Sequence, residues 1–217
     1  MRSKKIINLF CLSGVISAVF YLLHDVIGAM HYPNYDRMSQ AVSDLTALSA
    51  PSFVVANGLV SVYTVFSFLC TALICILIQD KGNKLLRLGV YLFAVMNTIS
   101  AIGFSLFPLT ESGYTGQFQD LMHLVVVALV VLFTIASLIP IIIGSFKLAS
   151  GKSLATYAII TLLCTLIGGI GVNIAPSSHF GFIQRFANYS IVIFTAILGL
   201  YGFFDFSALV QNSRKSG

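Results

Sequence analysis

Six apolar stretches, each close to the length of a membrane-spanning helix, dominate this sequence. Such a helix needs about 20 mostly apolar residues. The stretches cover residues 6–27, 53–78, 88–107, 121–143, 154–174 and 186–204. Only 9% of the 217 residues are charged, whereas an average soluble domain has about a quarter, so a soluble or disordered chain is excluded. The sequence predicts one all-α membrane domain over residues 1–217, a bundle of six transmembrane helices.

The basic residues predict how these helices face the two sides of the membrane. Lys and Arg accumulate in short cytoplasmic loops. If both termini lie on one side, that side holds ten of the twelve basic residues and two of the seven acidic ones, and the other side holds only Arg37 and Arg185 with five acids. Both termini are therefore predicted to be cytoplasmic, in a plasma membrane of the bacterial inner-membrane kind. A signal peptide would have a shorter apolar core of about 7–15 residues, so the first stretch is expected to be retained as a helix.

Charge and cysteine content limit the partners. A surface that follows nucleic-acid phosphates needs many clustered Lys and Arg side chains, which this chain lacks, so the expected partner is membrane lipid. The cysteines lie within the apolar stretches, at positions 11, 70, 75 and 164. They are expected to be small packing residues rather than disulfides or metal ligands.

Ionisable residues collect near the predicted outer ends of the helices. They are His24, Asp25, His31, Asp36, Asp44, Glu111, Asp120, His123, His179 and Arg185. Ionisable residues within spans usually face the bundle interior or a water-filled cavity, which predicts an outward-facing polar pocket. The alternative is ordinary decoration of the interface, with each side chain solvated separately.

The pocket residues allow several kinds of chemistry. Asp120 and His123 are one helical turn apart, so Asp120 could orient His123 as a base, with Asp44 as a further catalytic carboxylate. Ser43 and Arg185 are candidate ligand-binding residues, and Arg185 is expected to pair with Asp120 or Asp44 or to bind an anionic headgroup. A serine–histidine–aspartate arrangement using Ser39 or Ser43 remains open.

The most specific enzymatic hypothesis for this pocket is a zinc site. His24, His123 and His179 would be the metal ligands, with Asp44 or Asp120 as a fourth ligand or an orienting base. These three histidines have no recognised ligand spacing, so zinc is one candidate cofactor among the alternatives.

A repeated spacing suggests three helical hairpins with related outer ends. Gly28, Gly103 and Gly171 are each followed five residues later by a proline, at 33, 108 and 176. Each proline is followed by a glutamine and, four residues beyond it, by another polar residue: Gln40 and Asp44, Gln119 and His123, Gln184 and Asn188. Three unrelated helices that each end at a proline would give the same pattern.

The first external segment, residues 31–51, reads HYPNYDRMSQAVSDLTALSAP. Ser39 is a natural cap for a short interfacial helix over residues 40–48, and Pro51 then opens the second span. This segment resembles a bacterial and archaeal membrane family known as domain-of-unknown-function family 998, which shows a Pro-x-Tyr step, then Ser-[Asp/Glu]-Leu, then a proline. The matching positions are Pro33, Tyr35, Ser43, Asp44, Leu45, Ala47 and Pro51, and further matches are Phe107-Pro108, His123 and Gln184-Arg185.

The resemblance covers nearly the whole chain and implies a compact multi-helix membrane protein, without an established reaction. Gln184 stands where the family more often has Glu, which argues against an acid role there. Together, residues and resemblance predict a membrane protein whose outward-facing pocket binds a polar ligand or a lipid headgroup, with hydrolase-like catalysis as one version. The alternatives are a small transporter and a non-catalytic assembly or sensor subunit.

Overall fold

The structure, a computed structural model, describes residues 2–206 and residue 209. Within these residues the chain is helical and contains no strand. The α-helices are α1 (Arg2–Phe10), α2 (Ser13–Met30), α3 (Phe53–Ile78), α4 (Lys84–Leu106), α5 (Phe118–Phe146), α6 (Lys152–Gly171) and α7 (Phe180–Phe203). There are also two 3₁₀ helices among these residues. One, η1 (Val42–Thr46), lies between α2 and α3, and the other, η2 (Ser177–His179), lies between α6 and α7.

Six segments are long and apolar enough to cross a membrane, which confirms the predicted class. They cover Lys4–Met30, Phe53–Ile78, Lys84–Leu106, Phe118–Phe146, Lys152–Gly171 and Ser177–Phe203. The first predicted helix is divided into α1 and α2 at Cys11 and Leu12. The backbone tightens there, since the amides of Leu12 and Gly14 bond to carbonyls three residues earlier, as in a 3₁₀ turn.

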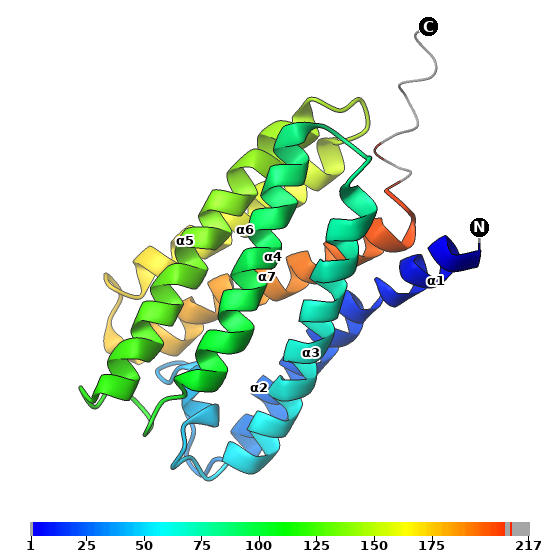
Figure 1. Ribbon diagram of the computed structural model, residues 1–217. Coiled ribbons are helices and arrows are strands. Elements are labelled where there is room, and N and C mark those ends of the chain that lie inside the picture. The colour runs from blue at the N-terminus through cyan, green and yellow to red at the C-terminus, as the bar shows by residue number, and fades with distance from the viewer. Residues whose placement is uncertain (1, 207–208, 210–217) are drawn as a thin grey trace, which may run out of the picture.

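The bundle is built from three helix pairs. The most extensive contacts join α2 to α3, α4 to α5 and α6 to α7, and α7 also packs on α2 and α3. The connections within these three pairs lie at one end of the bundle, and the N-terminus and the last described residues lie at the other (Figure 1). We call these the distal end and the proximal end. Arg214 and Lys215, which contribute to the predicted orientation, lie outside the described residues.

The repeated glutamine spacing corresponds to a common position in only two of the three pairs. Gln119 and His123 lie in the first turns of α5, and Gln184 and Asn188 lie in the first turns of α7. Gln40, however, precedes η1 in a loop. The first pair differs because a 22-residue segment between α2 and α3 folds over the distal end instead of extending the helix.

The short interfacial helix predicted over residues 40–48 is the 3₁₀ helix η1, and Ser39 does not cap it. The carboxylate of Asp44 accepts a hydrogen bond from the Ala41 amide at 3.0 Å and so closes the first turn. Ser39 Oγ instead donates to Asp36. That hydrogen bond, together with one from the Met38 backbone amide, holds the pKa of Asp36 below its usual value.

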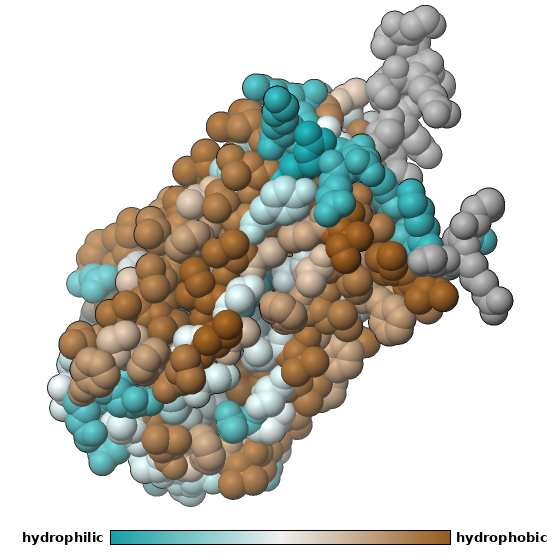
Figure 2. Space-filling model, in the orientation of Figure 1, coloured by the Kyte–Doolittle hydropathy of each residue, from teal (hydrophilic) through white to brown (hydrophobic). Residues whose placement is uncertain are grey.

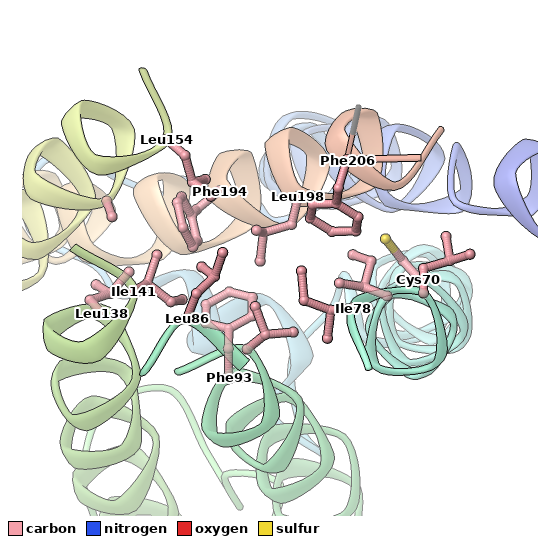
Figure 3. Packing of buried hydrophobic residues seen from close by; sticks show 14 of the residues in the cluster. Cys70, Ile78, Leu86, Phe93, Leu138, Ile141, Leu154, Phe194, Leu198 and Phe206 are labelled. Atoms are coloured by element: carbon pink, nitrogen blue, oxygen red, sulfur yellow. The ribbon is translucent and has the colours of Figure 1, made fainter. Parts of the chain in front are cut away.

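The main apolar core lies in the proximal half of the bundle. Phe93 of α4 and Phe194 of α7 meet edge to face at its centre, with 5.3 Å between ring centroids. Ile78, Leu86, Ile141, Leu154, Leu198 and Phe206 surround them (Figure 3). The outward surface of the helices is also apolar, and hydrophilic residues gather towards the two ends (Figure 2). This distribution is the one expected of helices that meet lipid along their sides.

Candidate functional site

The loop between α2 and α3 is anchored on the start of α7. The Phe182 amide donates to the Met38 carbonyl at 3.0 Å. A Cβ atom at Gly181 would overlap the Gln40 carbonyl oxygen and lie 2.9 Å from the Arg37 carbonyl oxygen, so only glycine allows this approach. The contact brings the loop over the buried side chain of Arg185, one turn further along α7.

Arg185 forms a buried ion pair with Asp25 of α2. Its Nε donates to Asp25 Oδ2 at 3.0 Å, and one terminal nitrogen donates to Oδ1 at 2.9 Å. This is the bidentate geometry that makes guanidinium–carboxylate pairs strong. Asp25 is completely buried. Its Oδ2 also accepts a hydrogen bond from the Tyr189 hydroxyl and forms an ion pair with a terminal nitrogen of Arg37 at 2.9 Å. We call Asp25, Arg37, Arg185, Tyr35 and Tyr189 the basic cluster.

The remaining donors of Arg185 hold the loop. One terminal nitrogen donates to the carbonyls of Arg37 at 2.8 Å, Gln40 at 3.1 Å and Gly181 at 2.8 Å. The other donates to the Tyr35 hydroxyl at 2.9 Å, which in turn donates to the Ala41 carbonyl at 2.6 Å. Burial raises the pKa of Tyr35 to about 12, so this hydroxyl keeps its proton at neutral pH and can play both roles.

Sequence reasoning expected a carboxylate partner for Arg185 but named the wrong ones. The partner is Asp25, not Asp120 or Asp44. Asp25 and Arg185 are 160 positions apart, and spacing along the chain cannot show that α2 and α7 are neighbours. The usable signal was that both residues are ionisable and lie at the outer ends of apolar spans, where such residues need partners.

The three predicted catalytic residues converge on the loop between α4 and α5. Asp120 accepts from the amide and hydroxyl of Thr110, at 2.9 Å each, and from the amide and hydroxyl of Thr115. Asp44 accepts from the Gly113 amide at 3.0 Å. His123 Nδ1 contacts the Phe107 carbonyl at 2.8 Å, which fixes it as the protonated ring nitrogen. These three side chains therefore support the backbone of one loop.

The other candidates are dispersed. His24 is buried at 2% exposure, and neither ring nitrogen has a hydrogen-bond partner in the part of the chain that the structure describes. His179 is exposed in η2 and contacts Ser178. Ser43 is half-buried in η1, and its carbonyl accepts from Thr46.

The structure does not assemble the predicted zinc site. Among residues 2–206 and 209, no three His, Cys, Asp or Glu side chains come together to hold a metal ion. The physical reason is that the three histidines have different environments. His24 is buried within the bundle, His123 is hydrogen-bonded to the Phe107 carbonyl, and His179 is exposed in η2.

Six membrane-length helices, closed at one end by loops and a buried guanidinium–carboxylate pair, define a polytopic membrane protein. The chain belongs to the family described as protein of unknown function DUF998, whose model matches residues 15–201. This confirms the resemblance seen in the sequence. Comparison with curated proteins and with solved structures gave no match.

Proposed function

We propose that this protein binds an anionic headgroup, of the phosphate class, at the basic cluster. The observation that carries the proposal is a charge imbalance. Two guanidinium groups, Arg37 and Arg185, share the single carboxylate of Asp25, so the five side chains of the cluster together retain one positive charge. The exposed carboxylate of Asp36 lies near enough to interact with the charge of Arg185 but forms no part of this shared contact. Guanidinium groups recognise phosphate by the same paired hydrogen bonds that they form with carboxylate.

Arg37 is the residue suited to contact the ligand. Its side chain is 45% exposed, whereas those of Arg185 and Asp25 are 9% and 0% exposed. Arg185 uses its donors within the protein, and its two hydrogen bonds to Asp25 do not involve Arg37. Arg37 can therefore turn towards an anion at the bundle surface, while Arg185 keeps the loop in place.

The position of the cluster favours a lipid headgroup over a transported solute. The buried ionisable groups of α2 and α7 lie at the distal end, which is predicted to face outward, and the proximal half is filled by the apolar core. A transporter site is typically near the midplane, between broken helices. Catalysis by Asp44, Asp120 and His123 stays a prediction, because these side chains are already bonded to the loop that they support.

Thermal unfolding in lipid nanodiscs tests this proposal. The protein is placed in phosphatidylcholine discs with or without phosphatidylglycerol, and a ligand that binds only the folded state raises the Tm. We expect phosphatidylglycerol to raise the Tm of the wild type and of Lys84→Gln, an exposed basic residue at the other end of the bundle, but not of Arg37→Gln. An equal rise in Arg37→Gln would contradict the proposal. A rise produced by inorganic phosphate alone would assign the site to a soluble anion instead of a lipid.

A further inference from the structure

A shallow, open crevice lies between α3 and α4, on the side of the bundle. Its lining is Tyr63, Thr64, Ser67, Asn97, Ser100 and Ala101. Asn97 is nine residues from the distal end of α4, which places it about 14 Å from that end at 1.5 Å per residue. The hydrocarbon layer is about 30 Å thick, so the crevice lies near mid-bilayer, well below the basic cluster.

A polar face of α3 leads from the distal end to this crevice. Asn57, Ser61, Thr64 and Ser67 follow one another at intervals of four, three and three, which places them on one side of the helix. Asn57 and Ser61 are exposed, Thr64 is half-buried and Ser67 is buried. A band of pale, weakly polar residues is visible among the brown ones in the part of the surface where α3 and α4 adjoin (Figure 2). The hydroxyls of Ser61 and Thr64 donate to the carbonyls of Asn57 and Val60, at 2.7 and 2.9 Å. Acyl chains cannot supply hydrogen bonds, so the demand for a polar partner falls on the crevice itself.

The hydrogen bonds within the crevice leave one donor and one acceptor side by side. Ser67 Oγ donates to Asn97 Oδ1 at 2.7 Å, and Asn97 Nδ2 donates to the Phe93 carbonyl at 3.0 Å. An amide nitrogen has two hydrogens and a serine oxygen has two lone pairs. One N–H of Asn97 therefore remains. The hydroxyls of Ser67 and of its neighbour Tyr63 supply an acceptor, so a single hydroxyl group complements both.

The size of the crevice and the lack of charge in its lining restrict the class of ligand further. The inner part of the crevice has room for about one water molecule. None of the six lining residues is Asp, Glu, Lys, Arg or His, so no countercharge would offset a phosphate or an ammonium group in this apolar layer. We propose that the crevice binds the hydroxyl of a neutral, hydroxyl-headed lipid, of the diacylglycerol or long-chain alcohol type. The lipid enters from the bilayer and lays its chains along α3 and α4.

Fluorescence quenching tests this site, because the chain contains no Trp. Phe68→Trp introduces a single reporter on α3, one turn from Thr64 and exposed. Ile160→Trp introduces a control on the exposed side of α6. Each variant is reconstituted in phosphatidylcholine with the same small fraction of brominated diacylglycerol, brominated phosphatidylcholine or brominated phosphatidic acid. If Phe68→Trp does not fold, Ile102→Trp, exposed beside Ala101 on α4, replaces it.

We expect brominated diacylglycerol to quench the Phe68→Trp reporter at least twofold more than the other two lipids, with no difference at the control. Adding Ser67→Ala should abolish the excess, and adding Ser105→Ala, an exposed serine outside the lining, should not. Equal quenching by all three lipids would leave only water in the crevice and overturn the proposal. Weaker quenching by every lipid than at the control would show that another protein helix covers this face, and an excess that survives Ser67→Ala would place the lipid elsewhere.

Discussion

Asp25 shows how one residue organises an end of this bundle. A carboxylate without water is costly unless it is paired and hydrogen-bonded. Arg185, Arg37 and Tyr189 together occupy both of its oxygens. Through Arg185 the same pair reaches two loop carbonyls, those of Arg37 and Gln40, so the charge of Asp25 fixes the loop as well as the two helices.

Asp25→Asn should therefore strongly destabilise the protein. It removes the negative charge and leaves the guanidinium of Arg185 buried without a counterion, a change that typically costs about 3–5 kcal/mol. Glu111→Gln removes an acid that is exposed in another distal loop and should be close to neutral. Thermal unfolding in detergent measures both. A loss below about 1 kcal/mol for Asp25→Asn would mean that the pair behaves like an exposed salt bridge.

Replacing His24 should have the opposite effect on stability from replacing Asp25. At 2% exposure, the two ring nitrogens of His24 have no hydrogen-bond partner among residues 2–206 and 209. An unsatisfied buried polar group costs about 1–3 kcal/mol. Phenylalanine keeps a ring of similar shape against Tyr21, whose centroid is 5.6 Å away, without the polar atoms. We expect His24→Phe to leave the Tm unchanged or to raise it. Marked destabilisation would show that His24 is hydrogen-bonded, for example to an internal water.

At the scale of the elements, the sequence predicted the helices better than the loops. The length of each apolar stretch is set by the bilayer, so six spans could be read without knowing their neighbours. The loops could not, because their conformation depends on distant residues. The carboxylate of Asp44 closes η1, where Ser39 was expected to, and also reaches Gly113 in the next distal loop. Asp25 was identified as a pocket residue, but its pairing with Arg185 required knowing that α2 packs on α7.

Gly181 provides a test of how the first distal loop is held. Gly181→Val would place side-chain atoms where the carbonyls of Arg37 and Gln40 lie and lift the loop from α7. Trypsin should then cut at Arg37 much faster than in the wild type. Gly58→Ala is the matched control: its Cβ would have no neighbour within 4 Å, and in an exposed helix alanine is favoured by about 1 kcal/mol. Unchanged cleavage in Gly181→Val would show that the loop does not depend on this contact.

On the scale of the whole molecule, the two halves of the bundle differ in chemistry. The distal half buries Asp25, Arg185, Asp120 and His123, and the proximal half packs aliphatic and aromatic side chains. At the proximal end, Lys81 bonds to the carbonyl of Asp205 at 2.6 Å and also contacts its carboxylate, which holds the end of α7 near the α3–α4 connection. This asymmetry supports the proposal that a headgroup binds at the distal end, and it makes the orientation of the bundle relevant to that proposal.

That orientation can be tested directly. The ten-to-two division of basic residues predicts cytoplasmic termini, and both the N-terminus and the last described residues lie at the proximal end (Figure 1). A reporter fused after Gly217 should therefore be active only in its cytoplasmic form. A reporter inserted within residues 108–118, in the loop that joins α4 to α5, should be active only in its external form. Because α4 separates this loop from the proximal end, finding both reporters on one side would refute the six-span topology. Finding the two sides exchanged would keep the fold but place the basic cluster, and its proposed headgroup, in the cytoplasmic leaflet.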